Sequence, residues 1–277
     1  MFEHILVAAD FSPAWTRLES QLERLRALGC RRLTLAHVLV EGYTRAPESG
    51  HAGHYEQRLE ELAAHLREQG FETDTAVRVG AVAPELERLA AERGAGVILA
   101  GTHGHSTLRD LFLGSTVRDL ARRARRPLLL APVHSEVAPG TEPVCRPLLA
   151  TDGSNAARTA EEVFVQLLPA CGRGVVVSVG RWEGDPSREE EHREIAAHVR
   201  ELAERGGEDA FDTVLPGQGR PSVEIGRIAE ERGADLVIIG KRGRNPVADL
   251  LLGSTAEAVC RHARRLTLLV PARADTN

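Results

Sequence analysis

The chain has 277 residues, 42% of them hydrophobic, and its 35 basic and 40 acidic side chains give a formal net charge of −5. That length suits two domains with substantial cores, while the charge excludes a global cationic field that would hold nucleic acid or an anionic membrane. Because no apolar stretch approaches the roughly 18 residues of a membrane span and the amino terminus lacks a signal-peptide pattern, we expect a soluble cytoplasmic protein without nucleic-acid or membrane partners.

Short apolar runs alternate with longer amphipathic stretches, which is typical of strand–helix–strand units around a buried parallel sheet. In the first half, the predicted strands are Ile5–Ala9, Leu33–Val40, Thr73–Val79, Val97–Ala100 and Leu128–Ala131. The helices predicted between them are Pro13–Leu28, His54–Gln69, Ala83–Arg93 and Ser115–Arg125. Val133–Val144 follows, with prolines and a glycine among polar residues, and its composition indicates a linker.

The second half repeats the same order of elements. Its predicted strands are Pro147–Thr151, Val175–Val179, Phe211–Leu215, Leu236–Ile239 and Leu266–Val270. Its predicted helices are Ala156–Leu168, Glu189–Arg205, Val223–Arg232 and Ser254–Arg264. We therefore predict two domains, 1–134 and 146–277, joined by a linker at 135–145.

A glycine pattern shows that the halves are copies of one another. Residues 101–132 laid on 240–271 give 15 identities in 32 positions, where unrelated sequences would give about two. Gly101, Gly104 and the run Gly114-Ser115-Thr116 recur as Gly240, Gly243 and Gly253-Ser254-Thr255. In both copies a loop of small residues leads from a strand into a helix, an arrangement typical of phosphate binding.

Two further positions in each half converge on this loop if the halves are open, doubly wound sheets. Such sheets bind ligands outside the carboxyl ends of their strands. The first strand ends in Ala9-Asp10 or Thr151-Asp152, and the second reaches Val38 or Val179. The aspartate can accept hydrogen bonds from ribose hydroxyls or a base amine, and the loop glycines let backbone N–H groups approach phosphate oxygens. These residues predict a nucleotide site in each half.

With these motifs the chain resembles a tandem universal stress protein of the ATP-binding type, over nearly its whole length. The resemblance rests on a glycine, two residues, a glycine, nine residues and then Gly-Ser, which both copies meet without a gap. It implies two Rossmann-like α/β domains with five parallel strands in the order 3-2-1-4-5, paired with each other through their last strands. It also implies adenine beside Val38 or Val179, and ATP as the ligand, with Mg²⁺ held on its phosphates.

The two glycine loops differ in charge. The first reads Thr102-His103-Gly104-His105, and the second reads Lys241-Arg242-Gly243-Arg244, with the only lysine of the chain. Cations near a polyphosphate strengthen binding, so we predict tighter ATP binding in the second half at neutral pH. Plainer interpretations remain open: a tight strand-to-helix turn for the glycines, an Asx turn or helix cap for the aspartates, and solvated loop residues for the cations.

No metal site of the protein's own is predicted. His103 and His105 lack a third ligand at metal spacing, and the cysteines lie far apart, as expected of packing residues in a reduced compartment. No Walker loop or nucleophile elbow is present, and no side chain is identifiable as a catalytic base. We therefore favour an ATP-binding regulatory protein of the stress response, acting through an unknown protein partner and able to form a homodimer. The alternatives are a slow ATPase or phosphotransferase, and a protein-interaction scaffold that binds no nucleotide.

Overall fold

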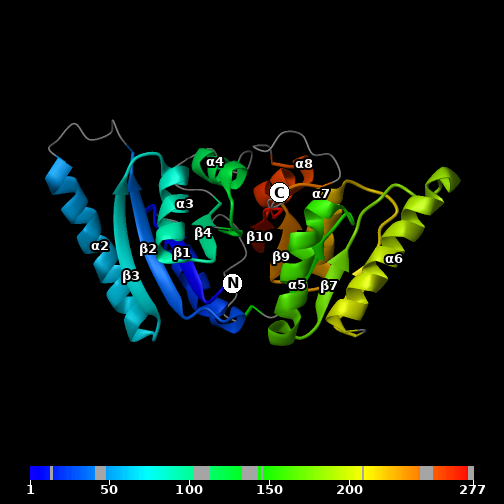
Figure 1. Ribbon diagram of the computed structural model, residues 1–277, viewed down its shortest axis with the longest axis horizontal. Helices are drawn as coiled ribbons and strands as arrows, with labels where there is room; N and C mark the ends of the chain where they lie inside the picture. The colour runs from blue at the N-terminus through cyan, green and yellow to red at the C-terminus, as the bar shows by residue number, and fades with distance from the viewer. Residues whose placement is uncertain are drawn as a thin grey trace. The chain divides into compact units, whose positions relative to one another are not determined.

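The computed structural model divides the chain into two compact units, Met1–Thr141 (unit 1) and Glu142–Asn277 (unit 2). In each unit, parallel strands alternate with helices along the chain (Figure 1). The structure describes residues 1–12, 15–40, 48–102, 113–132, 143–144, 146–207, 209–243 and 252–273. Among them, no helix is both long and apolar enough to cross a membrane.

Unit 1 contains five parallel strands in the spatial order β3-β2-β1-β4-β5. These strands are β1 (His4–Ala8), β2 (Arg32–Leu39), β3 (Glu72–Val79), β4 (Val97–Gly101) and β5 (Leu128–Ala131). The described helices are α1 (Trp15–Leu22), which continues as the 3-10 helix η1 (Glu23–Leu28), α2 (Glu48–Glu68), α3 (Val82–Arg93) and α4 (Ser115–Arg123). Helix α3 packs on α4 over one face of the sheet.

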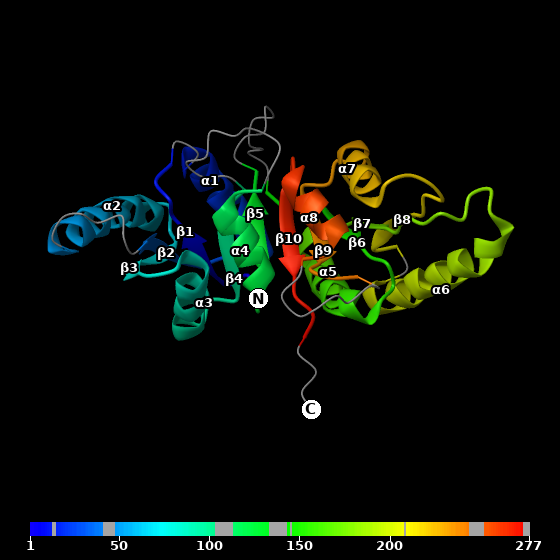
Figure 2. The same cartoon turned by 90° about the horizontal axis from the view of Figure 1, so that it is seen from above.

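Unit 2 repeats this topology with the order β8-β7-β6-β9-β10. Its strands are β6 (Pro147–Ala150), β7 (Gly174–Val177), β8 (Phe211–Val214), β9 (Leu236–Gly240) and β10 (Leu266–Val270). The helical segments are η2 (Asn155–Ala157), α5 (Arg158–Cys171), η3 (Pro186–Arg188), α6 (Glu189–Gly206), α7 (Pro221–Glu231) and α8 (Ser254–Arg261). Figure 2 shows α7 on one side of these strands and α5 and α6 on the other.

The inner strands of each unit are largely apolar on both faces, which helices cover, whereas the edge strands β3 and β8 carry polar residues and are partly exposed. Ile5, Leu6 and Val7 of β1 are completely buried, and every residue of β7 and β9 is buried. Gly29 and Gly94 end η1 and α3 with positive φ, a left-handed conformation that favours glycine.

The predicted fold class is confirmed: each unit is an open α/β sheet with the strand order 3-2-1-4-5. The pairing of the last strands concerns how the two units are placed, and it stays a prediction, as do the linker and domain limits. Several predicted helix limits were wrong: α2 begins at Glu48 rather than His54, α4 ends at Arg123 rather than Arg125, and α8 ends at Arg261 rather than Arg264. Helix α5 continues through Pro169 to Cys171, because Leu168 and Cys171 are buried and their packing outweighs the hydrogen bond that the proline forgoes.

Candidate functional site

A cavity of about 320 Å³ lies in unit 2 at the carboxyl ends of β6, β7 and β9. Its volume falls in the range of small-molecule sites, roughly 300 to 1,000 Å³. The amino-terminal turns of α7 and α8 close its other side, with Pro221 and Ile225 from α7. Most residues predicted for this half line it together: Thr151, Asp152, Val179, Gly240, Gly243, Gly253, Ser254 and Thr255.

Asp152 follows β6 and turns the chain into unit 2's first helix. Its Oδ1 accepts a hydrogen bond from the backbone N–H of Ser154 over 3.0 Å, and Asp10 makes the same bond with Ser12 in unit 1, also over 3.0 Å. The Asx-turn interpretation therefore holds for both aspartates. It does not compete with a ligand role, because Asp152 lines the cavity as well.

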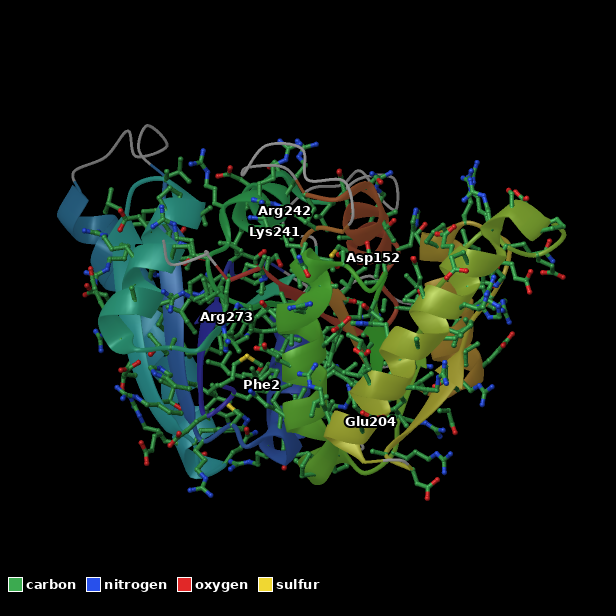
Figure 3. The ribbon with its side chains drawn as sticks, turned by 45° about the vertical axis from the view of Figure 1, so that its right-hand side comes forward. Phe2, Asp152, Glu204, Lys241, Arg242 and Arg273 are labelled. Atoms are coloured by element: carbon green, nitrogen blue, oxygen red, sulfur yellow. The ribbon has the colours of Figure 1, made fainter. Side chains whose placement is uncertain are left out.

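Gly243 brings the second glycine loop directly against this aspartate. A Cβ atom added at Gly243 would overlap Oδ2 of Asp152, so an alanine there would force the carboxylate to move. Figure 3 shows Asp152, Lys241 and Arg242 at the same end of unit 2. The first and fourth strands of the unit thus contribute to one crevice, as the sequence predicts for a doubly wound sheet.

The third glycine of each pattern closes its loop by a backbone hydrogen bond. The N–H of Gly253 donates to the carbonyl of Lys241 over 3.0 Å, and that of Gly114 donates to Thr102 over 3.3 Å. Each glycine is also the N-cap of the next helix, α8 or α4. Because the first N–H groups of a helix have no partner within it, Ser254 and Thr255 present donors at the cavity wall.

The cationic residues of the second loop are placed differently from one another. Arg242 lines the cavity, whereas Lys241 is 5% exposed and is not among the lining residues. The N–H of Lys241 donates to the carbonyl of Val270 over 2.7 Å, which fixes the start of the loop to β10. Lys241, predicted to contact the ligand, therefore lies outside the cavity wall. The residue that reaches the cavity is its neighbour.

The predicted residues of unit 1 occupy equivalent positions. They lie at the carboxyl ends of β1, β2 and β4 or at the start of α4: Ala9, Asp10, Val38, Gly101, Gly114, Ser115 and Thr116. Gly104 and His105 in this unit, and Arg244 in unit 2, lie outside the described residues.

Sequence reasoning missed a buried polar network beneath the unit 2 cavity. Glu161 of α5 is completely buried, and its Oε1 accepts the hydroxyl of Thr151 at 2.5 Å and Nε2–H of His198 at 2.8 Å. Thr151 in turn accepts the N–H of Gly153 over 3.1 Å. The network ties the turn after β6 to α5 and α6. No spacing in the sequence indicates it, because its members come from three separate elements.

A second feature that was missed is an aromatic cluster in unit 1, formed by Phe11, His37 and Tyr55. The rings of His37 and Tyr55 stack with centroids 4.3 Å apart, and Phe11 lies 5.0 Å from His37. Phe11 has a φ of 53°, which is uncommon for a bulky residue, and it follows Asp10 directly. The cluster therefore stands beside the predicted site of this unit.

The described cysteines behave as packing residues. Cys30, Cys171 and Cys260 are buried free thiols, and burial raises the pKa of Cys30 and of Cys260 to about 12. Within the described ranges, no group of three or more histidine, cysteine or acidic residues could hold a metal ion.

Fold and cavity together define a class, the doubly wound α/β proteins with a ligand crevice at the carboxyl ends of the strands. Comparison with protein families narrows that class. The model of the universal stress protein family matches residues 1–132 and again 146–271. The chain therefore belongs to the universal stress protein family, with two copies of its domain in tandem.

Individual relatives agree with this assignment. A universal stress protein of Mycolicibacterium smegmatis is 27% identical over 97% of both chains. One of Mycobacterium tuberculosis is 30% identical over 63% of this chain, and the alignment spans 61% of that relative's length. A solved universal stress protein of Archaeoglobus fulgidus superposes with a TM-score of 0.74 at 20% identity, covering 97% of this chain and 96% of the other. That superposition shows a shared two-domain fold.

Proposed function

We propose that the chain binds an adenine nucleotide, ATP by preference, and that occupancy of the unit 2 cavity regulates the protein's conformation or its choice of protein partner. One observation carries this proposal. Asp152, the loop from Gly240 to Gly243 and the amino terminus of α8 meet around a single cavity.

Each part of the cavity suits a different part of the ligand. The N–H groups and hydroxyls of Ser254 and Thr255 face the phosphates, where the positive end of α8 favours an anion, and Arg242 adds a cation. The Asp152 carboxylate accepts hydrogen bonds from ribose or base, while Val179 and Ile225 supply apolar walls for the base. Mg²⁺, which binds phosphate oxygens and water, would be held through the nucleotide rather than by a cluster of protein ligands.

Regulation by occupancy requires a ligand that binds one conformation better than another. The cavity draws its walls from the ends of three strands and from α6, α7 and α8, so a bound nucleotide would tie these elements together. Any partner that recognises the tied arrangement would then bind more tightly when nucleotide is present, and the coupling would be reciprocal.

The test is calorimetric titration of the purified chain with ATP, with and without Mg²⁺. Gly243→Ala should weaken binding at least about tenfold, or roughly 1.4 kcal/mol, because the new methyl displaces the Asp152 carboxylate. Gly226→Ala is the matched control, since a Cβ at that position in α7 meets nothing within 4 Å. The proposal fails if the chain neither binds added adenine nucleotide nor releases any on denaturation.

A further inference from the structure

The turn that carries Asp152 is held on both sides of that residue by one buried hydrogen-bond network. The hydroxyl of Thr151 donates to Oε1 of Glu161 over 2.5 Å, and the N–H of Gly153 donates to Oγ1 of Thr151 over 3.1 Å. Asp152 stands between Thr151 and Gly153, and its Oδ1 accepts the N–H of Ser154 over 3.0 Å. The direction in which the Asp152 carboxylate points therefore depends on how its two neighbours are bound.

Gly153 gives this turn little stiffness of its own. It has a φ of 70°, and glycine can adopt many other conformations without strain. The equivalent residue of unit 1, Phe11, also has a positive φ, 53°, but its side chain allows far fewer alternatives. A flexible residue beside a carboxylate that faces a ligand has to be fixed by its surroundings. In unit 2 those surroundings are the bond to Thr151 and the packing of α6.

Helix α6 lies directly against the turn. A Cβ added at Gly153 would be 3.0 Å from Cδ1 of Ile195 and 3.5 Å from Cδ2 of His198. Residues three and four apart share a helix face, and four residues before Ile195 stands Glu191, which lines the cavity. Nε2 of His198 also lies 2.8 Å from Oε1 of Glu161. One face of α6 thus lines the cavity and contacts both the turn and the buried carboxylate.

Glu161 itself stands behind the cavity wall. Its side chain is completely buried, and neither it nor His198 is among the residues that line the cavity. Its neighbours on the buried face of α5 are apolar: Ala160, Phe164 and Leu168. An apolar residue would pack there without the cost of burying a carboxylate, and replacing a buried ionic group in this way is often neutral for stability. Stability alone therefore does not account for a glutamate at this position.

Unit 1 cannot form the same link, because its residue equivalent to Thr151 is Ala9. The N–H of Ala9 donates to Ala36 and that of Thr151 donates to Val177, so both residues join the end of the first strand to the second. Alanine has no hydroxyl. The turn of unit 1 is held from the second strand, where Nδ1–H of His37 donates to the carbonyl of Ala9 over 2.7 Å. Support through a buried glutamate and a threonine hydroxyl is thus a property of unit 2.

We propose that Glu161 and His198 are positioning residues of the unit 2 cavity, and that through Thr151 they hold the turn in the conformation that aims Asp152 at a bound nucleotide. The inference rests on the proposed function and adds to it two residues that do not touch the ligand. A binding site needs its contacting groups held to within about 0.5 Å, and the residues behind them provide that precision.

The first experiment measures the ATP affinity of the full chain by calorimetry, at a temperature where urea unfolding shows each variant to be fully folded. Glu161→Ala should weaken binding at least about tenfold, because a carboxylate displaced by even 1 Å loses its contact. Glu161→Gln keeps an acceptor for Thr151 and His198 and should stay within about twofold of the natural chain. Unchanged affinity of Glu161→Ala would overturn the inference.

Glu162→Ala is the matched control for this measurement. The side chain of Glu162 pairs with Arg273 over 3.2 Å and lines no part of the cavity, so its removal should leave the affinity unchanged. A loss as large as that of Glu161→Ala would show that any acidic residue of α5 has the same effect, and the inference would be wrong.

A double-mutant cycle separates positioning from a general loss of structure. If Glu161 acts through Asp152, Glu161→Ala should change the affinity by less than about twofold once Asp152→Ala has removed the carboxylate. An equal loss in both backgrounds, or full affinity of Asp152→Ala alone, would overturn the inference while leaving nucleotide binding intact. Absence of ATP binding by the natural chain would instead remove the proposed function, and this inference with it.

The other members of the network provide the test if Glu161→Ala does not fold. Thr151→Val keeps the shape of the side chain without its hydroxyl and should weaken ATP binding at least about tenfold, whereas Thr151→Ser should recover the affinity. His198→Leu removes a donor that lies outside the cavity and should weaken binding at least about threefold. If neither Thr151→Val nor His198→Leu weakens binding, the network does not position the site.

Discussion

Glu161 lies in a buried polar environment that the sequence did not predict. It is a completely buried carboxylate that accepts two hydrogen bonds through Oε1, while Oε2 has no hydrogen-bond partner among the described residues. Burial of a carboxylate is costly unless hydrogen bonds or opposite charges compensate. The hydrogen bonds from Thr151 and His198 therefore compensate for the burial of the Glu161 carboxylate.

Glu161→Ala should lower the free energy of unfolding by about 1 to 3 kcal/mol, because it removes the acceptor of the Thr151 hydroxyl and of His198 Nε2. Glu161→Gln keeps an acceptor and should cost less. The adjacent Glu162, whose ion pair with Arg273 is largely exposed, is the control, and Glu162→Ala should cost under about 1 kcal/mol. Urea unfolding of the three variants measures these differences. Equal losses at 161 and 162 would show that the buried network contributes nothing special.

His4 makes the stability of unit 1 depend on pH. Its side chain is buried, with Nε2 2.8 Å from Oγ1 of Thr34, and burial, reinforced by Arg32, lowers its pKa below 6.5. The unfolded chain therefore takes up the proton first as the pH falls. Stability is unaffected well above pH 6.5 and falls below it, by at most about 1.4 kcal/mol per pH unit, until the folded pKa is passed.

Comparison of urea unfolding at pH 7.5 and pH 5.5 tests this direction. His4→Gln should lose part of the decrease, because the amide does not titrate. His65→Gln alters an exposed histidine of α2 and should keep the decrease of the natural chain. If His4→Gln has the same pH dependence as the natural chain, the decrease arises elsewhere.

At the residue scale, backbone-controlled features could be predicted and side-chain contacts could not. The glycine spacing and the two aspartates predict which segments meet, because strand order and turn geometry bring them together. The placement of Lys241 away from the cavity and of Arg242 in its wall depends on side-chain directions within one loop. The network of Glu161 depends on packing among three elements, which no local pattern encodes.

Among the elements, β7 and α5 are joined by a close contact at a glycine. A Cβ added at Gly174 would lie 2.7 Å from Cζ of Phe164 and 3.0 Å from Cδ2 of Leu168. Gly174→Ala should therefore destabilise unit 2 by about 1 to 3 kcal/mol, as overpacking of a core does. Gly226→Ala in α7 should instead be neutral or stabilising by up to about 1 kcal/mol. Thermal or urea unfolding of both variants measures the difference. Equal losses for Gly174→Ala and Gly226→Ala would show that the close contact at Gly174 is not the cause.

Strands were predicted more closely than helices for a physical reason. A buried strand of a parallel sheet is apolar throughout, so its limits coincide with the ends of an apolar run, as for Leu128–Ala131 and Leu266–Val270. Helix ends depend on packing as well as on sequence signals. The segment predicted as one helix up to Leu28 changes to a 3-10 helix at Glu23, and α8 ends at Arg261, before the predicted Arg264.

For the whole molecule, the nucleotide site proposed in unit 2 predicts that ATP stabilises the elements around that cavity. ATP at about a hundred times its dissociation constant should stabilise unit 2 by about 2.7 kcal/mol, which slows amide exchange through unfolding of that unit roughly a hundredfold. Hydrogen–deuterium exchange with and without ATP should show this slowing in peptides of β6, β9 and α8. Equal slowing in β1, β4 and α4 would indicate that unit 1 is also occupied.

The duplication was visible in the sequence because both halves contain the same glycine spacing, which the turn between strand and helix requires. The divergence between the copies was not, because Phe11, His37 and Tyr55 lie in three elements whose proximity only the fold reveals. The sequence therefore predicted the features that the two units share. Of the differences between the units, it predicted only the charges of the two glycine loops.

Phe11 and Gly153 also bear on how such a chain can evolve. When two identical single-domain subunits associate, one gene specifies both sites, and any substitution appears in each. In a fused chain, the codons for residues 11 and 153 are separate, so one site can be lost or recruited while the other is kept under selection. Fusion thus allows the two domains to diverge within one gene, whereas two separate subunits could diverge only if each had its own gene.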